Sequence, residues 1–446
     1  MLLRIFDDLQ TARATVLRRK PSEEVPLPAA VRERNRQVFG AELNAEEVVR
    51  EILAAVRTEG DSAVRRFELA FDGLSLDSLE VSASEIDRAW ESLPRATRDA
   101  LELAASRVRR FHERAMPRSW IDVDGDSIFG QTFRPLARLG IYAPGGRAVY
   151  PSTVLMTAVP ARVAGVGSIA LCTPPAADGL PHPAVLGAAR VAGIDRIFRV
   201  GGAQAIAALA FGTETIPAVD KVVGPGNIFV TTAKRQIFGL VGIDQLAGPT
   251  ETLLVADDSA SPVALAADLL AQAEHDPMAT ALLITNFRGI AAATAAEVER
   301  QIVDLPRRAI IAESLRTNGA AVIAPTIDAA VDLANEFAPE HLCLTIRDAW
   351  SQLPRVRNAG GIFLGHHSIE AIGDYTAGPS HVMPTGGTAR FASPLSVFDF
   401  LKVSSIFDVS RATFQQIGPA AVALAEAEGL HGHAAAIRLR QGGDAD

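Results

Sequence analysis

The chain has 446 residues, of which 48% are hydrophobic and 21% charged, a composition typical of a globular enzyme with two or three domains. Its net charge of −9 argues against a nucleic-acid binder, which needs a basic face. With two cysteines the chain has no disulfide framework, which favours the cytoplasm. We expect no signal peptide, because Asp7 and Asp8 interrupt the apolar N-terminus, and no membrane span, because no run of about 18 apolar residues occurs.

The first part of the chain is predicted to be helical. Apolar residues recur at helical spacing over 45–60, after Asn44 as a helix cap, and again over 96–115. His112 falls in the second helix, where we expect a solvated surface side chain. The stretch Asp122–Asp126 resembles the start of a calcium loop but lacks the glutamate that closes such a loop, so we interpret it as a turn between strands.

From about residue 130, short β-branched runs alternate with alanine-rich helices, which indicates parallel sheets with helices on their faces. Strands are predicted at 168–173, 196–200, 221–223, 252–256, 281–285, 321–324, 342–346 and 362–364, and helices at 150–165, 183–192, 203–211, 227–238, 262–274, 287–303 and 327–337. The pattern resets near 244–251, so we infer two doubly wound α/β units. The remaining C-terminal tail is predicted to be helical and too short to form a core alone.

Two glycine-rich loops are candidates for anion binding. Gly201-Gly202 and 224–227 (Gly-Pro-Gly-Asn) each lie between a predicted strand and helix, where backbone N–H groups suit a pyrophosphate. Either loop could equally be a connecting turn. The letters of a dinucleotide fingerprint also occur at 165–170, but there a helix ends and a strand begins, so we discard that match.

Seven of the nine histidines lie from His275 onward, most of them near a carboxylate. Imidazole and carboxylate together can form a catalytic metal site with an acid or base beside it. Gln272 and His275 share one face of a helix, and Asp374 lies in a loop after the last strand, where ligands of α/β proteins collect. These groups suit zinc, although spacing alone favours Glu274 over Gln272, because glutamine is an uncommon zinc ligand.

Further candidates follow in the second half of the chain. The neighbours Glu340 and His341 can divide proton removal and water activation between them, or they can be a simple ion pair at a helix end. His381 lies in a loop rich in glycine and proline, where functional residues are common. His366 and His367 point to opposite faces in an extended chain, so we interpret them as surface residues.

The tail and the cysteines complete the candidates. His433 has Glu428 five positions before it, and spacing does not distinguish His433 from His431 as a ligand. Cys172 and Cys343 lie in predicted strands, where a buried apolar role is expected.

From about residue 30 to the C-terminus the chain resembles histidinol dehydrogenase. The matching segments are LGIYAPGGRAVYPSTVLMTAVPARVAGV, GGAQAIAALAFGT, VVGPGNIFVTTAKR, IDQLAGPTE, DLLAQAEHDP, APEHL, GDYTAGPSHVMPTGGTARF and AEGLHGHAAAI. The resemblance implies oxidation of L-histidinol to L-histidine through an aldehyde, with two NAD and one zinc ion per subunit. It also implies two incomplete Rossmann-like units, one inserted in the other, with helical N-terminal and C-terminal segments.

The resemblance assigns residues by role. Glu340 is expected to activate water and His341 to take the alcohol proton. The expected zinc ligands are Gln272, His275, Asp374 and His433, which also surround the substrate. Further expected substrate contacts are Thr250, His341, His381 and Glu428, and the expected NAD contacts are Tyr142, Gln204 and Asn227.

The resemblance also implies a homodimer in which the tail crosses to complete the partner's site. The expected domains are an N-terminal helical segment at 1–22, a larger α/β domain at 23–130 plus 251–385 that carries the metal and catalytic residues, an inserted NAD-binding domain at 131–250, and a helical tail at 386–446.

The sequence departs from the usual family pattern at three places: Thr250 replaces serine, Phe229 replaces tyrosine, and His366-His367 replaces a less basic loop. A threonine at this position also occurs in relatives that oxidise other alcohols, including sulfonated diols, so a dehydrogenase of another small polar alcohol is the first alternative. A zinc hydrolase is a second alternative, which the expected NAD contacts argue against. A non-catalytic metal-binding regulator would not need Glu340 and His341.

Overall fold

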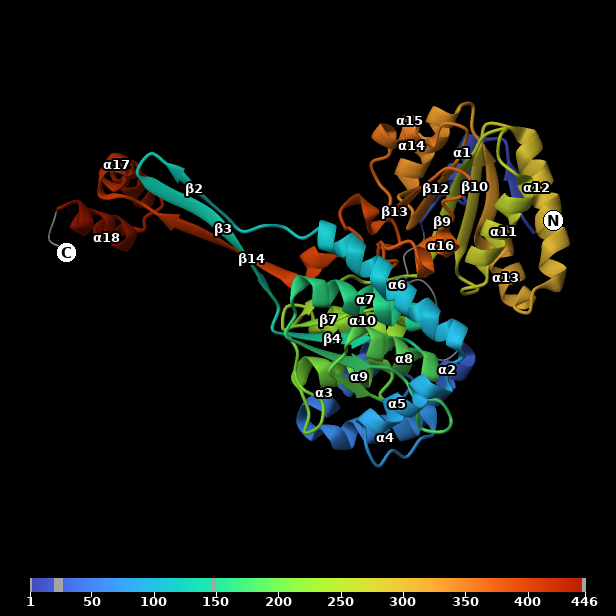
Figure 1. Cartoon of the computed structure of the whole chain (residues 1–446), viewed down its shortest axis with the longest axis horizontal. Coiled ribbons are helices and arrows are strands. Elements are labelled where there is room, and N and C mark those ends of the chain that lie inside the picture. The colour runs from blue at the N-terminus through green and yellow to red at the C-terminus, as the bar shows by residue number, and fades with distance from the viewer. Residues whose placement is uncertain (1, 20–26, 146–148, 443–446) are drawn as a thin grey trace. The chain divides into compact units, whose positions relative to one another are not determined.

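A computed structural model describes residues 2–19, 27–145 and 149–442 of the chain (Figure 1). The chain forms two compact units: unit 1 comprises Met1–Ala115 and Leu136–Phe400, and unit 2 comprises Met116–Pro135 and Leu401–Asp446. The expected boundary between residues 22 and 23 lies outside the described residues. Unit 1 contains two parallel sheets with covering helices, which confirms the predicted doubly wound α/β class.

The first sheet of unit 1 has the order β1-β11-β10-β9-β12-β13, and all its strands are parallel. Its strands are β1 (Arg4–Phe6), β9 (Glu251–Ala256), β10 (Thr280–Thr285), β11 (Gly319–Ile323), β12 (His341–Thr345) and β13 (Gly361–Leu364). Every residue of β9 is buried, as a central parallel strand covered on both faces requires. β1 was not expected, because the sequence predicted a purely helical N-terminal segment.

Helices cover both faces of this sheet (Figure 1). They are α1 (Leu9–Ala14), α11 (Pro262–Ala273), α12 (Arg288–Gln301), α13 (Arg308–Asn318), α14 (Ile327–Phe337), α15 (Ala349–Gln352) and α16 (Glu370–Tyr375). Leu254 of β9 packs in the core under α11, α12 and α13, whereas Leu253 packs in the core with α1 and α14. Neighbouring residues of the strand therefore serve opposite faces, as the pleat of a strand dictates.

The second sheet of unit 1 has the order β6-β5-β4-β7-β8 and is also parallel. Its strands are β4 (Arg138–Tyr142), β5 (Ser168–Cys172), β6 (Arg196–Phe198), β7 (Lys221–Val223) and β8 (Gly242–Ile243), and its helices are α7 (Pro151–Ala164), α8 (Pro183–Ala192), α9 (Gly202–Phe211) and α10 (Ile228–Ile237). Cys172 is buried in β5 and Cys343 in β12, which confirms the predicted core role of both cysteines.

The N-terminal helices pack against the helices that cover this second sheet. They are α2 (Ala29–Phe39), α3 (Ala45–Glu59), α4 (Asp61–Asp72), α5 (Ala83–Ser92) and α6 (Arg95–Arg114). Val49 and Ile52 of α3 share one core with Ile206 of α9, because the apolar stripe of α3 needs an apolar partner and α9 presents one. This packing differs from the expected grouping of 23–130 with 251–385.

His112 of α6 is buried, with 1% of its surface exposed, so the predicted surface position is wrong. Burial lowers the pKa of the imidazole to about 4, which keeps the ring neutral. The basic residues around it in the sequence misled the prediction, since they occupy the other faces of the same helix.

Unit 2 contains an antiparallel sheet of order β14-β3-β2 and two helices. Its elements are β2 (Trp120–Asp124), β3 (Ser127–Pro135), β14 (Leu401–Asp408), α17 (Arg411–Ala427) and α18 (His431–Gln441). The predicted turn at Asp122–Asp126 does lie between two strands, β2 and β3. The expected tail at 386–446 differs from this unit, because 386–400 belong to unit 1 and 401–408 form a strand.

Short 3-10 helices at Ile302–Asp304, Leu353–Arg355, Thr388–Arg390 and Val397–Phe400 complete the described elements. Among the described residues, no helix combines the length and the apolar character that crossing a lipid bilayer requires.

Candidate active site

The candidate metal and catalytic residues of unit 1 meet at the end of the first sheet where its strands begin. Thr250 immediately precedes β9, and His341 is the first residue of β12, opposite Thr252 in the parallel register. Gln272 reaches the same edge because α11 follows β9 and runs back along the sheet. Asp374 was expected at the carboxyl end of the last strand, but it lies 3.8 Å from Nε2 of His341 at the opposite end of the sheet.

Glu340 is a buried carboxylate, with 6% of its surface exposed. Its Oε2 accepts hydrogen bonds from the Thr250 hydroxyl over 2.6 Å and from the Glu251 backbone N–H over 2.9 Å. Burial raises the pKa of Glu340 to about 7, although His341 and the two hydrogen bonds oppose that shift. The carboxyl group is thus poised to exchange a proton near neutral pH.

His341 is held in one tautomer. Its Nδ1 lies 3.0 Å from the backbone carbonyl of Glu251, and a carbonyl can only accept, so Nδ1 carries the hydrogen. Its Nε2 is buried without a hydrogen-bond partner among the described residues, 3.8 Å from Oδ1 of Asp374. In the neutral form of this ring Nε2 is the acceptor, the atom that can take a proton from a ligand.

A group of potential metal ligands lies next to His341. Ligand atoms of His275, Glu370 and Asp374 all lie within 4.8 Å of one another. Burial lowers the pKa of His275, while Asp374 opposes that shift. A neutral imidazole beside a carboxylate is the form that binds a divalent ion.

Gln272 adds an oxygen whose environment fits a ligand. Its side-chain N–H donates to the Thr250 hydroxyl over 2.9 Å, whereas its Oε1 is buried and has no hydrogen-bond partner among the described residues. A buried polar atom without a partner is costly. The oxygen and nitrogen ligand atoms present therefore fit a divalent cation such as zinc.

Glu370 was not predicted from the sequence, and Asp374 was expected in a loop. In the structure both lie on α16, four residues apart and hence on one helix face. That spacing was the available signal, but a helix of six residues is too short to show an apolar period. Burial and the nearby Asp374 raise the pKa of Glu370 well above its ordinary value. Glu274, which spacing favoured, is not part of the described cluster.

His381 connects this site to α7 of the second sheet. Its Nδ1 donates to the backbone carbonyl of Asp374 over 2.9 Å, so its Nε2 accepts from the Thr153 hydroxyl over 3.2 Å. Burial lowers the pKa of His381. His366 and His367 are exposed, in agreement with the predicted surface role.

The expected NAD residues Tyr142 and Gln204 lie together but are deeply buried, with 3% and 1% exposed. The Tyr142 hydroxyl accepts from the N–H of Gly202 over 3.1 Å. Glu68 of α4 accepts from the N–H of Gly201 over 2.9 Å and from the Gln204 amide over 2.8 Å. The expectation of free N–H groups in this loop is therefore wrong, because protein oxygens already occupy them.

In the second glycine-rich loop, protein groups occupy Gly224. The N–H of Gly224 donates to Asp244 over 2.8 Å, and the buried Lys234 bonds the Gly224 carbonyl over 2.9 Å and forms an ion pair with Asp244. Asn227 is exposed, and its side chain caps α10 by accepting from the N–H groups of Phe229 and Val230.

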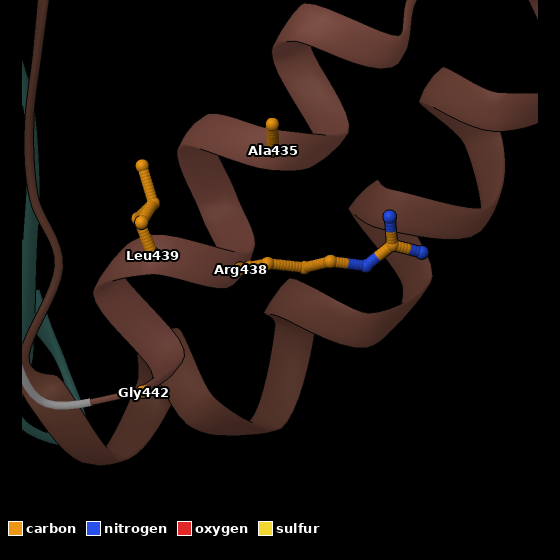
Figure 2. Close-up of a pocket in the computed structure, with 4 residues that line it drawn as sticks. All are labelled: Ala435, Arg438, Leu439 and Gly442. Carbon is orange, nitrogen blue, oxygen red and sulfur yellow. The ribbon is translucent and has the colours of Figure 1, made fainter.

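Glu428 and His433 belong to unit 2, where both side chains are exposed. Glu428 follows the last residue of α17, and His433 lies in the first turn of α18. A hollow of about 380 Å³ lies beside the end of α18 and is lined by Ala435, Arg438, Leu439 and Gly442. Figure 2 labels these four residues. Its charged member, Arg438, forms an ion pair with Glu426, and none of the predicted site residues lines it.

Comparison with known proteins gives a consistent result. The family model described as "Histidinol dehydrogenase" matches residues 35–441. Histidinol dehydrogenase of Synechococcus sp. is 51% identical over 90% of this chain and 93% of that protein. The enzyme of Deinococcus radiodurans is 50% identical over 97% of this chain and 99% of that protein. The crystal structure of histidinol dehydrogenase from Elizabethkingia anophelis matches with a TM-score of 0.90 and 34% identity over 98% of each chain.

Proposed function

Because the chain belongs to the histidinol dehydrogenase family, we propose that it oxidises L-histidinol to L-histidine through histidinaldehyde, with two NAD and a zinc-anchored substrate. One observation carries this proposal: the buried pair Glu340–His341 lies directly beside the metal-ligand cluster. Nε2 of His341 is 3.8 Å from Asp374, and the Thr250 hydroxyl links Glu340 to Gln272.

The zinc ion would be held by Gln272, His275, Asp374 and, from the tail, His433. The unpartnered Oε1 of Gln272 and the closeness of His275 to Asp374 support the first three. When bound, zinc would supply an anchor for the imidazole and amine of the substrate, which would keep a reactive aldehyde in place between the two oxidations.

His341 would act in the first oxidation. The alcohol must lose its proton before hydride leaves its carbon, so a base has to lie within hydrogen-bond reach of the hydroxyl. The Glu251 carbonyl fixes the hydrogen on Nδ1, which leaves the lone pair of Nε2 for that proton. The imidazolium formed would be stabilised by the neighbouring Glu340 and Asp374.

Glu340 would act in the second oxidation, in which the aldehyde must first add water. An ionised Glu340 would accept a proton from that water as its oxygen adds to the aldehyde carbon, and the hydrate anion formed would then give hydride to NAD to become the acid. A pKa of about 7 suits this role, because the carboxyl group is partly ionised at neutral pH and basic enough to take the proton.

NAD would accept the two hydrides. We propose Tyr142, Gln204 and Asn227 as contacts of the dinucleotide. Tyr142 bonds the turn Gly201-Gly202 directly, and Gln204 is linked to it through Glu68. Asn227 is exposed at the start of α10. Both positions are helix N-termini, whose dipoles favour an anionic ligand.

The tail would complete the site as part of a homodimer. We propose that Glu428 and His433 serve the partner's site, with Thr250 and His381 as further substrate contacts. Unit 2 supports this proposal, because its own core consists of few residues and many of its large apolar side chains are exposed, among them Trp120, Phe407 and Leu424.

We also propose a cytoplasmic location, which the two buried, unpaired cysteines support.

A steady-state assay with L-histidinol and NAD tests the activity. We expect two NADH and one histidine per histidinol consumed. Thr250 favours one alternative, a dehydrogenase of another small polar alcohol such as a sulfonated diol. A panel of alcohols separates the two: a strong preference for a substrate without imidazole would replace histidinol by that substrate.

A further inference from the structure

Arg19, from the N-terminal segment, makes a dense set of contacts with the chain just before Glu340. Its guanidinium donates to the Phe337 carbonyl over 2.7 and 3.2 Å and to the Ala338 carbonyl over 3.1 Å. The guanidinium carbon also lies 3.8 Å from the centroid of the Phe337 ring. These contacts bind the last residue of α14 and the residue after it.

The backbone that Arg19 holds is strained. Ala338 has a φ of +52°, and among the described residues it is the one non-glycine with a positive φ. A side chain is disfavoured in this left-handed region, so the conformation persists only where the surroundings impose it. Ala338 lies two residues before Glu340, so its conformation sets the direction in which Glu340 and His341 enter the site.

Arg19 also forms an ion pair with Glu251, whose side chain is buried. Glu251 contacts both proposed catalytic residues through its backbone: its N–H donates to Glu340, and its carbonyl accepts from Nδ1 of His341. The loop at Gly387 lies against the Arg19–Glu251 ion pair, because the N–H of Gly386 donates to Glu251 over 3.2 Å. A Cβ on Gly387 would lie 3.1 Å from Nε of Arg19, and its φ of +81° also favours glycine.

We propose that Arg19 is a positioning residue for the Glu340–His341 pair. It acts from two sides, through the strained turn at Ala338 and through Glu251, and thereby sets the Nε2 of His341 and the carboxylate of Glu340 toward the substrate. The inference rests on the catalytic roles proposed above, and it gives the N-terminal segment a function in the reaction.

The first test compares Arg19→Met with Arg13→Met in the full-length, zinc-loaded enzyme. Arg13 is a matched control, because it docks the same segment through Glu336, over 2.8 and 2.9 Å, without touching the turn or Glu251. We expect Arg19→Met to lower kcat about 10- to 100-fold with KM for histidinol changed less than about threefold, since small misplacements of reacting groups are costly. Arg13→Met should keep both constants, and both variants should keep their zinc.

Arg19→Lys and Arg19→Ala extend this test. Lysine keeps the charge but not the fork of donors, so Arg19→Lys should recover part of kcat. Added ethylguanidinium should partly restore Arg19→Ala and leave Arg13→Ala unchanged. An unchanged kcat in Arg19→Met, or an equal loss in Arg13→Met, would overturn the proposal, because a merely structural docking role would affect both in the same way.

A second measurement does not depend on activity. Nitrogen-15 spectra of histidine-labelled protein report which ring nitrogen of His341 carries the hydrogen. We expect the Nδ1–H form in the unsubstituted protein and a mixture of tautomers in Arg19→Met. An unchanged tautomer would overturn the proposal even if histidinol is the substrate. Conversely, a tautomer shift together with no histidinol oxidation by the unsubstituted enzyme would reject the proposed substrate and keep the positioning role.

Discussion

The hydroxyl of Thr250 donates a hydrogen bond of 2.6 Å to the carboxylate of Glu340. The same hydroxyl accepts from the amide of Gln272 over 2.9 Å, so one oxygen orients both a proposed general base and a proposed metal ligand. Because this bridge uses the N–H end of Gln272, its Oε1 has no hydrogen-bond partner among the described residues and is available as a ligand atom. Thr250 is therefore a structural link between the two halves of the site, whatever alcohol the site accepts.

Replacing Thr250 tests this link. Thr250→Val keeps the shape of the side chain but removes both hydrogen bonds. We expect the aldehyde-to-acid half to slow by about 10- to 100-fold, which corresponds to the free energy of one hydrogen bond to a charged group. Thr250→Ser keeps the hydroxyl and should stay within about threefold of the unsubstituted rate. Rapid-quench analysis of both halves is the measurement, and equal rates for Val and Ser would contradict the bridge.

Glu340→Gln separates the two oxidations. The amide cannot take a proton from water, so the aldehyde-to-acid half should slow more than the alcohol-to-aldehyde half, while zinc content and histidinol binding stay largely intact. Supplying histidinaldehyde directly isolates the second half. Equal slowing of both halves would contradict the role assigned to Glu340.

The pKa of Glu340 predicts a pH dependence. The group must be ionised to act as a base, so the rate of the aldehyde-to-acid half should rise as the pH rises through about 7. His341 favours the ionised form, and Glu251 opposes it. The measurement is a pH profile of aldehyde oxidation in the unsubstituted enzyme, with Glu340→Gln as control. A flat profile between about pH 6 and 8 would contradict the prediction.

Metal content distinguishes the ligands. His433→Ala is expected to lose zinc, whereas His431→Ala, two residues away on the same exposed turn, is expected to keep it. Glu370→Gln should also keep zinc, because the raised pKa of Glu370 favours an uncharged carboxyl group that glutamine mimics. Elemental analysis of the purified variants is the measurement. Zinc retained in His433→Ala and lost in His431→Ala would exchange the two assignments.

Glu68 predicts how stability changes with pH. Burial raises its pKa from 4.5 to about 7, although Gln204 and the N–H of Gly201 stabilise the charged form. The unfolded chain therefore releases this proton at lower pH than the folded one, and folding stability falls as the pH rises from 4.5 through about 7. Glu68→Gln keeps an acceptor for both donors and removes the charge. The difference in unfolding free energy between Glu68→Gln and the unsubstituted protein should therefore grow in favour of the variant, by about 3 kcal/mol from about pH 5 to about pH 8. Urea unfolding at each pH measures it. A constant difference across this range would contradict the prediction.

Much of the fold could be predicted from local patterns. The alternation of short apolar runs with alanine-rich segments predicts both parallel sheets, because a strand covered on two faces needs side chains such as Leu253 and Leu254 in succession. Asn44, as a helix cap, likewise predicts where α3 begins, and in the structure it caps that helix. These features depend on neighbours in sequence, so the sequence carries them in full.

The candidate residues were also visible as residue types, since histidines next to carboxylates stand out along the chain. Their arrangement was not visible. They meet at the end of the sheet where the strands begin, because α11 runs back along the sheet to that end and because His341 lies opposite Thr252 in the strand register. Glu370 was missed because α16 is too short to show a period.

The sequence by itself determined the fold class, the buried strands and the types of group available for catalysis, because these follow from periodicity and side-chain chemistry. The tertiary structure alone decided which groups share hydrogen bonds: Glu68 and Asp244 on the glycine-rich loops, and Arg19 on the turn before Glu340. Each of these contacts joins segments far apart along the chain. Such contacts form only when packing brings the segments together, and no local pattern records that geometry.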